Sequence, residues 1–219
     1  MEGWMRLLLR ILVYAAGLFF MAAGVALAIN SNLGVSPVNS LPYVISLISG
    51  ADMGTCVTVV FGFYILVQIL LKRKNFAWVN LTQMIFSAMF GYFVDFAKML
   101  AGGFVLPGYI GQLMTLMMSM VLVAIGLSLY MGVKLVNMPM EGMTLAISEC
   151  IPGIPFHRVK MTVDCGAVAF GIVLSFLFLG DLQGIREGTI LSAVFTGKLL
   201  SLVQKIVSPV VNRICFGED

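Results

Sequence analysis

The sequence predicts an all-α integral membrane protein with about six transmembrane helices and two short half-helices. Of its 219 residues, 60% are hydrophobic and only 11% are charged, whereas roughly 25% of the residues in a soluble domain are charged. The charged residues are also bunched, so that uncharged runs remain of about the 20 residues that cross a bilayer. A soluble helical protein could not bury this much apolar surface.

The first span is predicted at 11–29, between Arg10 and a polar Asn-Ser-Asn sequence. Its start resembles a signal peptide, and Ala26-Leu27-Ala28 resembles a cleavage site. The apolar run, however, exceeds the roughly 7–15 residues of a signal-peptide core, and it has a counterpart later in the chain. We therefore expect a retained first membrane helix.

The remaining hydrophobic runs predict five more spans and two short helices. The spans are expected at 54–71, 77–97, 110–133, 159–180 and 188–209. The short helices are expected at 37–49 and 139–150, and each of them begins with proline. The apolar part of the first, 41–48, is too short to cross a bilayer core of about 30 Å as a helix.

The order of these elements occurs twice, which indicates an internal repeat over 1–104 and 105–219. Gly24 and Gly126 differ by 102 positions, and so do Pro37 and Pro139. Three spans in each copy is an odd number, so the second copy must enter the membrane from the opposite face. The expected architecture is an inverted repeat of two three-span units.

The positive charges predict the orientation, because cytoplasmic loops are enriched in Lys and Arg. If the chain crosses the membrane six times, ten of its basic residues lie on one side. They are Arg6, Arg10, Lys72, Arg73, Lys74, Lys134, Arg158, Lys160, Lys205 and Arg213. The other side keeps only Lys98 and Arg186. We therefore expect both termini in the cytoplasm and, from the resemblance described below, a place in the bacterial inner membrane.

The two short helices are the strongest indication of a binding site. Half-helices in matching positions of inverted repeats commonly mark the midplane site of a transporter, and their N-termini favour an anionic group. The alternative is a pair of helices lying flat at the membrane surface. The candidate substrate-binding residues are Ser36, Pro37, Asn39, Ser40, Pro139, Glu141, Gly142, Asp164, Thr189 and Lys198.

Three of these candidates carry a charge, and each has a second interpretation. Glu141 either caps its own helix or binds a cation or proton. Lys198, near the middle of the last span, either faces the bundle interior, where Asp164 could pair with it, or extends towards the interface. Thr189 and the adjacent Gly188 are better explained by close helix packing than by ligand contact.

Several stretches resemble the YczE/YyaS/YitT family of bacterial membrane proteins. They are LGVSPVNSLPYVIS, FSAMFGYFVDF, RVKMTVDCG and GTILSAVFTGK, and the resemblance covers nearly the whole chain. The soluble C-terminal domain of the YitT-like branch is missing, so the chain is closer to the YczE-like branch. The resemblance implies a bacterial inner-membrane protein and, by analogy, transport, but no substrate.

The expected function is a small secondary transporter or exporter of a small organic solute, with an anionic group favoured by the helix N-termini and Lys198. The alternatives are a substrate-binding membrane subunit of a larger transporter and a non-transport scaffold. The residues indicate no enzyme chemistry, metal site, cofactor or nucleic-acid binding. Membrane lipids are expected partners, and the size is compatible with a homodimer.

Overall fold

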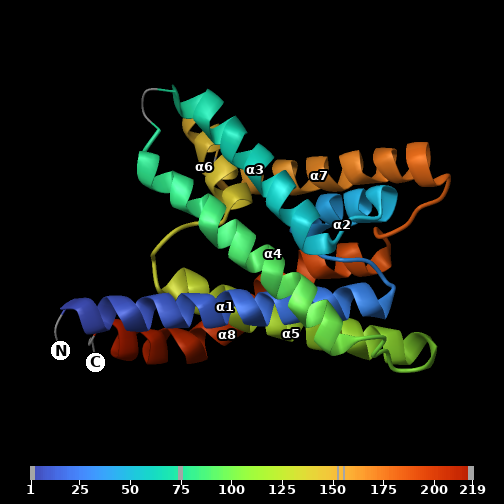
Figure 1. Ribbon diagram of the computed structural model, residues 1–219, viewed down its shortest axis with the longest axis horizontal. Helices are drawn as coiled ribbons and strands as arrows, with labels where there is room; N and C mark the ends of the chain where they lie inside the picture. The colour runs from blue at the N-terminus through green and yellow to red at the C-terminus, as the bar shows by residue number, and fades with distance from the viewer. Residues whose placement is uncertain (1–2, 74–75, 152, 155, 217–219) are drawn as a thin grey trace.

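The computed structural model describes residues 3–73, 76–151, 153–154 and 156–216, and this part of the chain is helical apart from its links (Figure 1). The long helices are α1 (Gly3–Ser31), α3 (Met53–Lys72), α4 (Thr82–Ala101), α5 (Gly108–Gly132), α7 (Phe156–Leu179) and α8 (Glu187–Cys215). The short helices are α2 (Pro37–Ser49) and α6 (Pro139–Cys150), and a single 3-10 turn, η2 (Trp78–Leu81), precedes α4.

All six predicted spans are present as helices that are long and apolar enough to cross a membrane. The predicted fold class is therefore confirmed, with both short helices in their expected places. The last helix continues to Cys215, beyond the predicted end at residue 209. Pro209 removes one backbone hydrogen bond there without ending the helix, which membrane helices tolerate when neighbouring groups satisfy the freed carbonyl.

The two short helices begin in the same way. Pro37 and Pro139 each occupy the first helical turn, where a missing N–H costs nothing, and an extended residue precedes each of them. The end of α2 is fixed by Gly50, which adopts a φ of 70° and donates its N–H to the carbonyl of Ser46. A left-handed residue of this kind is a common helix stop.

Helices α1 and α5 pack closely because glycines lie where their backbones cross. A Cβ on Gly24 would lie 2.8 Å from the carbonyl oxygen of Ser119, and a Cβ on Gly126 would lie 2.5 Å from that of Gly17. The two contacts are reciprocal, since positions 24 and 126 differ by 102 and so do 17 and 119. Such reciprocity is what a two-fold relation between the halves would produce.

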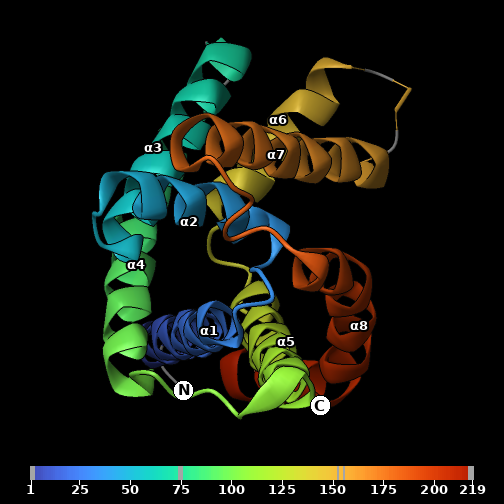
Figure 2. The same cartoon turned by 90° about the vertical axis from the view of Figure 1, so that its right-hand side faces the viewer.

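The helix pairs around this crossing also come in matched sets. Helix α2 packs against α3 and α7, and α6 packs against α7 and α3. Helix α1 packs against α4, and α5 packs against α8. Two pairs have no counterpart: α3 and α4 are in close contact whereas α7 and α8 are separated (Figure 2), and α1 packs against α8 whereas α4 and α5 are not in close contact.

The helices run mostly along the long axis of the molecule, and the two chain ends lie together. Figure 1 places both termini at the left and the links 102–107 and 180–186 at the right. At the left end, Arg10 donates hydrogen bonds to the carbonyls of Val133 and Lys134, at 3.0–3.3 Å, and Arg6 donates to that of Phe216. We call this end, which gathers Arg6, Arg10 and Lys134, the basic end.

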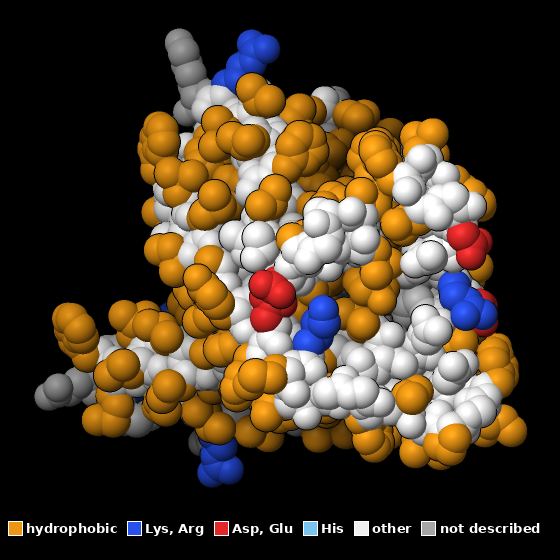
Figure 3. Space-filling model, turned by 45° about the vertical axis from the view of Figure 1, so that its right-hand side comes forward, with side chains coloured by type: hydrophobic (Ala, Val, Ile, Leu, Met, Phe, Trp, Pro, Cys, Tyr) orange, Lys and Arg blue, Asp and Glu red, His pale blue; other side chains and the backbone are white. Residues whose placement is uncertain are grey.

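The outer surface is apolar, as a lipid-facing surface must be. Figure 3 shows one face covered mostly by hydrophobic side chains, with charged groups only in isolated places. Large apolar side chains are exposed along most spans, among them Leu70, Ile110 and Ile206, each more than 70% exposed. Such an extent of exposed apolar surface is not found on soluble monomers.

Candidate functional site

A cavity of about 470 Å³ lies between the N-termini of α2 and α6, and we call it the central cavity. Every helix from α1 to α8 contributes to its wall. Most of the wall is apolar, for example Phe61 and Phe90, which stack with ring centroids 6.2 Å apart. Its volume is within the range of about 300–1,000 Å³ that small-molecule sites occupy.

The polar groups of the central cavity come from α2, α6, α7 and α8 and from the links that precede α2 and α6. Ser36 and Asn39 stand at the start of α2, and the Asn39 amide donates to the Ser36 hydroxyl at 3.1 Å. Glu141 lies in the first turn of α6, and Lys160 and Asp164 come from α7. Among the described residues, the Asn39 side-chain oxygen is buried without a hydrogen-bond partner.

Three interactions fix the carboxylates of this cavity. The Tyr130 hydroxyl donates to the Glu141 carboxylate at 2.5 Å, and the same carboxylate interacts with the backbone N–H of Met138, the residue before α6. Lys160 holds the Asp164 carboxylate at 2.7 and 2.9 Å. Glu141 therefore supports its own helix, as one sequence interpretation predicted, while it also lines the cavity.

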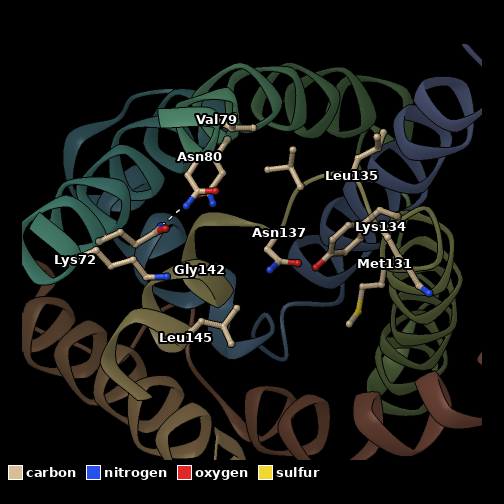
Figure 4. Close-up of a pocket in the computed structure, with 13 residues that line it drawn as sticks. Lys72, Val79, Asn80, Met131, Lys134, Leu135, Asn137, Gly142 and Leu145 are labelled. Carbon is tan, nitrogen blue, oxygen red and sulfur yellow. Dashed lines mark hydrogen bonds between the residues drawn. The ribbon is translucent and has the colours of Figure 1, made fainter. Parts of the chain in front are cut away.

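A second cavity of about 430 Å³ opens towards the basic end, and we call it the vestibule. Figure 4 shows Lys72, Asn80 and Asn137 arranged around it. Met131, Leu145 and Asn137 line both the vestibule and the central cavity, so the two spaces adjoin. Lys72 and Lys134 line the same vestibule, and the prediction that both lie on one side of the membrane stays a prediction.

The opposite end is closed by a contact between the link that leaves α1 and the link that enters α8. Gly188 donates its N–H to the carbonyl of Leu33 at 2.8 Å, and Val35 donates to that of Gly184 at 3.4 Å. We call residues 33–35 and 184–189 the glycine seam. A Cβ on Gly34 would lie 2.6 Å from the Thr189 hydroxyl oxygen, so no larger residue fits without displacing the seam.

A buried amide ties α6 to the first half of the chain. The Gln68 side chain donates to the Gln83 side-chain oxygen and to the carbonyl of Pro139, each at 3.0 Å. Both glutamines are at most 3% exposed. Gly142 is required beside this amide, because a Cβ there would lie 2.6 Å from the Gln68 side-chain oxygen.

The structure brings together five of the ten candidate residues. Ser36, Pro37, Asn39, Glu141 and Asp164 line the central cavity. Ser40 is buried and donates to the Pro37 carbonyl at 2.7 Å, so it supports the first turn of α2. Pro139 and Gly142 lie against Gln68. Thr189 is buried in the glycine seam, as the packing interpretation predicted.

The prediction that Lys198 faces the bundle interior is wrong. Lys198 is exposed, with its ammonium nitrogen 5.7 Å from the centre of the Phe195 ring. The adjacent Gly197 lines the central cavity, but Lys198 does not. The proposed pairing with Asp164 is also wrong, because Lys160, one turn away on α7, binds that carboxylate. A partner on the same helix is held near at all times and needs no tertiary contact.

The sequence interpretation missed three residues of the site: Tyr130, Lys160 and Gln68. Lys160 was counted only as a topology signal, although its spacing of four residues from Asp164 was available as a sign of a local pair. Gln68 lies inside an apolar span, where an amide signals a buried hydrogen bond. No sequence signal pairs Tyr130 with Glu141, because they meet only after the link between α5 and α6 folds back.

The helices, apolar exterior and enclosed cavity define a multi-span, all-α membrane protein. Within that class, the chain belongs to the family of unknown function DUF6198, whose profile matches residues 8–205. The Bacillus subtilis (strain 168) protein named uncharacterized membrane protein YczE is 29% identical over 208 residues, covering 91% of this chain and 88% of its own length. Uncharacterized protein YyaS of the same organism is 25% identical over 201 residues, covering 91% and 94%. No solved structure matches.

Proposed function

We propose that this protein is a secondary transporter or exporter of a small organic solute, built as an inverted repeat of residues 1–104 and 105–219. The observation that carries this proposal is a solute-sized cavity between two half-helix N-termini, adjoined by a vestibule at one end and closed by a seam at the other. A site reached from one side at a time is what alternating access requires.

The two ends of the molecule are related in a way that supports this proposal. Residues 33–35 correspond to 135–137 at the offset of 102, and 184–189 correspond to 79–84 at the later offset of 105. Backbone hydrogen bonds join segment 33–35 to segment 184–189. The corresponding segments, 135–137 and 79–84, are separated by the vestibule. Exchanging the two conformations would close the vestibule and open the glycine seam.

In the proposed orientation the basic end faces the cytoplasm of a bacterial cell, so the vestibule is open to the inside. This follows from the cluster of Arg6, Arg10 and Lys134 at the end where both termini lie. The two short helices act as re-entrant elements within this arrangement, since their first turns line the central cavity. Lipids, and in a homodimer a second copy, would cover the exposed face of α8.

The proposal predicts that cross-linking the vestibule shut changes the side of the membrane from which a reagent can enter the central cavity. In a variant without the four native cysteines, we replace Ser36 with cysteine as a reporter, and we replace Asn80 and Asn137 with cysteine to be joined first by oxidation to a disulfide, which leaves the reporter thiol unmodified. Before the cross-link, a membrane-impermeant maleimide should label position 36 from the basic end only. After it, labelling should move to the opposite side.

The control carries Ser36→Cys and Asn80→Cys alone, so that the same oxidation step cannot bridge positions 80 and 137. It should keep labelling at position 36 from the basic end. A protein that only captures a solute for a larger transporter, or acts as a scaffold, would lose labelling from the basic end after the cross-link and gain none on the other side. That result would contradict transport by alternating access.

A further inference from the structure

The central cavity offers a solute one carboxylate and no free cation among its described residues. Its charged wall residues are Glu141, Lys160 and Asp164. Lys160 and Asp164 neutralise each other at 2.7 Å, whereas no ion pair among the described residues involves Glu141. An anion bound there would lie in an apolar space beside a like charge, which is unfavourable at low dielectric.

The helix N-termini do not reverse this balance. The positive end of α6 already faces the Glu141 carboxylate, through the Met138 N–H, and an acidic residue in a first turn takes up the favourable interaction that an external anion would make. At the start of α2, Asn39 presents a buried oxygen without a hydrogen-bond partner in the described chain. Glu141 and Asn39 therefore both offer acceptors, which suit a group that donates hydrogen bonds.

We propose that the central cavity binds an organic cation with an apolar body, and that Glu141 recognises its charge in competition with a proton. This inference rests on the proposed site and replaces the expectation of an anionic group, which depended on the two helix N-termini and Lys198. The apolar wall, including Phe61 and Phe90, contacts the body of the cation. The same carboxylate cannot hold a proton and an ammonium group together, so binding of one releases the other.

The route of the proton to Glu141 is given by Tyr130. Tyr130 lines the vestibule, whereas Glu141 lines the central cavity, and their hydrogen bond joins the two spaces. The other titratable groups that face Glu141 are Tyr14 on α1, 5.8 Å from the Tyr130 ring, and the Lys160–Asp164 pair on α7. The pair is balanced, so Glu141 is the group whose charge changes.

Two isosteric probes test the sign of the charge. Tetraphenylphosphonium is an apolar cation, and tetraphenylborate has the same shape and the opposite charge. We expect equilibrium dialysis of the purified full chain to show saturable binding of tetraphenylphosphonium only. Between about pH 8 and about pH 5 that binding should weaken, because protons compete for Glu141 and the fraction of chains with a free carboxylate falls.

The variant Glu141→Gln should weaken tetraphenylphosphonium binding by about 30-fold or more, since one partner of a buried charge pair is lost. It should also remove the pH dependence. Glu141→Asp keeps the charge and should retain binding with its pH dependence, which covers the case in which Glu141→Gln does not fold. The matched control is Glu149→Gln, an exposed carboxylate paired with Lys72, which should bind as the unmodified chain does.

Three results would overturn the inference: no saturable binding of tetraphenylphosphonium, binding of tetraphenylborate in its place, or unchanged binding in Glu141→Gln. These measurements involve no transport. A transporter with an anionic solute would therefore fail here and still pass the cross-linking experiment, and a static cation-binding protein would do the reverse.

Discussion

Replacing Gly54 with valine is expected to prevent stable folding of the first half of the protein. A Cβ at this position would overlap the carbonyl oxygen of Gly91 and a carboxylate oxygen of Asp95. The Gly91 carbonyl is backbone and the position of a Cβ does not depend on the rotamer, so no side-chain adjustment relieves the overlap and the cost should exceed the roughly 1–3 kcal/mol of ordinary overpacking. The variant would also displace Asp95, which accepts a hydrogen bond from the Gly54 N–H at 2.8 Å.

The measurement is the fraction of monodisperse protein after extraction in mild detergent, followed on heating by size-exclusion chromatography. The matched control is Gly62→Val in the same helix, where a Cβ would make ordinary contacts of 3.5 and 3.7 Å with the flexible end of Met84. The control should be recovered like the unmodified protein. Equal recovery of the two variants would contradict the assigned contact between α3 and α4.

Replacing Gly34 with alanine is expected to open the glycine seam. Gly34 has a φ of 102°, and its Cβ would lie 2.6 Å from the Thr189 hydroxyl oxygen and 2.8 Å from the Arg186 backbone nitrogen. Left-handed backbone costs about 1–2 kcal/mol with a side chain, and the overlap adds to this. Since 1.4 kcal/mol changes an equilibrium tenfold, a cysteine at position 36 should react at least about tenfold faster with an impermeant maleimide added at the seam end.

The control for this variant is Gly180→Ala. Gly180 also has a positive φ, 71°, but nothing lies within 4 Å of its Cβ. It therefore carries the backbone strain without the overlap, and labelling at position 36 should stay slow from the seam end. Fast labelling in both variants would mean that strain in the loops, rather than the contact with Thr189, determines access.

The fold could be predicted from the sequence because bilayer-crossing helices are specified locally. Long apolar runs fixed by the hydrocarbon thickness gave all six spans, and a proline in each first turn marked α2 and α6. The last helix continues past the predicted end at 209 to Cys215, through the more polar residues that the apolar run did not include. The repeat of 1–104 and 105–219 and the sidedness of the termini stay predictions.

The site could be predicted only in part, because its chemistry depends on which side chains meet. The position of Lys198 along the last span indicated a depth near the middle of the membrane. The direction in which its side chain points depends on the rotation of α8 about its axis, which is set by packing against α5. The short-range pair of Lys160 and Asp164 then determined which carboxylate stays without a cation. Glu141 was selected from the sequence and lines the cavity, whereas its partner Tyr130 comes from the preceding long helix and could not be inferred.

The separation of α7 from α8 affects the size of the solute that the central cavity can bind. Both helices line the central cavity, and the lining residues Phe156 and Gly197 are also exposed on the outside. In a bilayer this flank of the cavity would face the hydrocarbon layer. A long-chain amphiphile could keep its head beside Glu141 while its tail extends among the acyl chains, so the enclosed volume sets no upper limit on tail length.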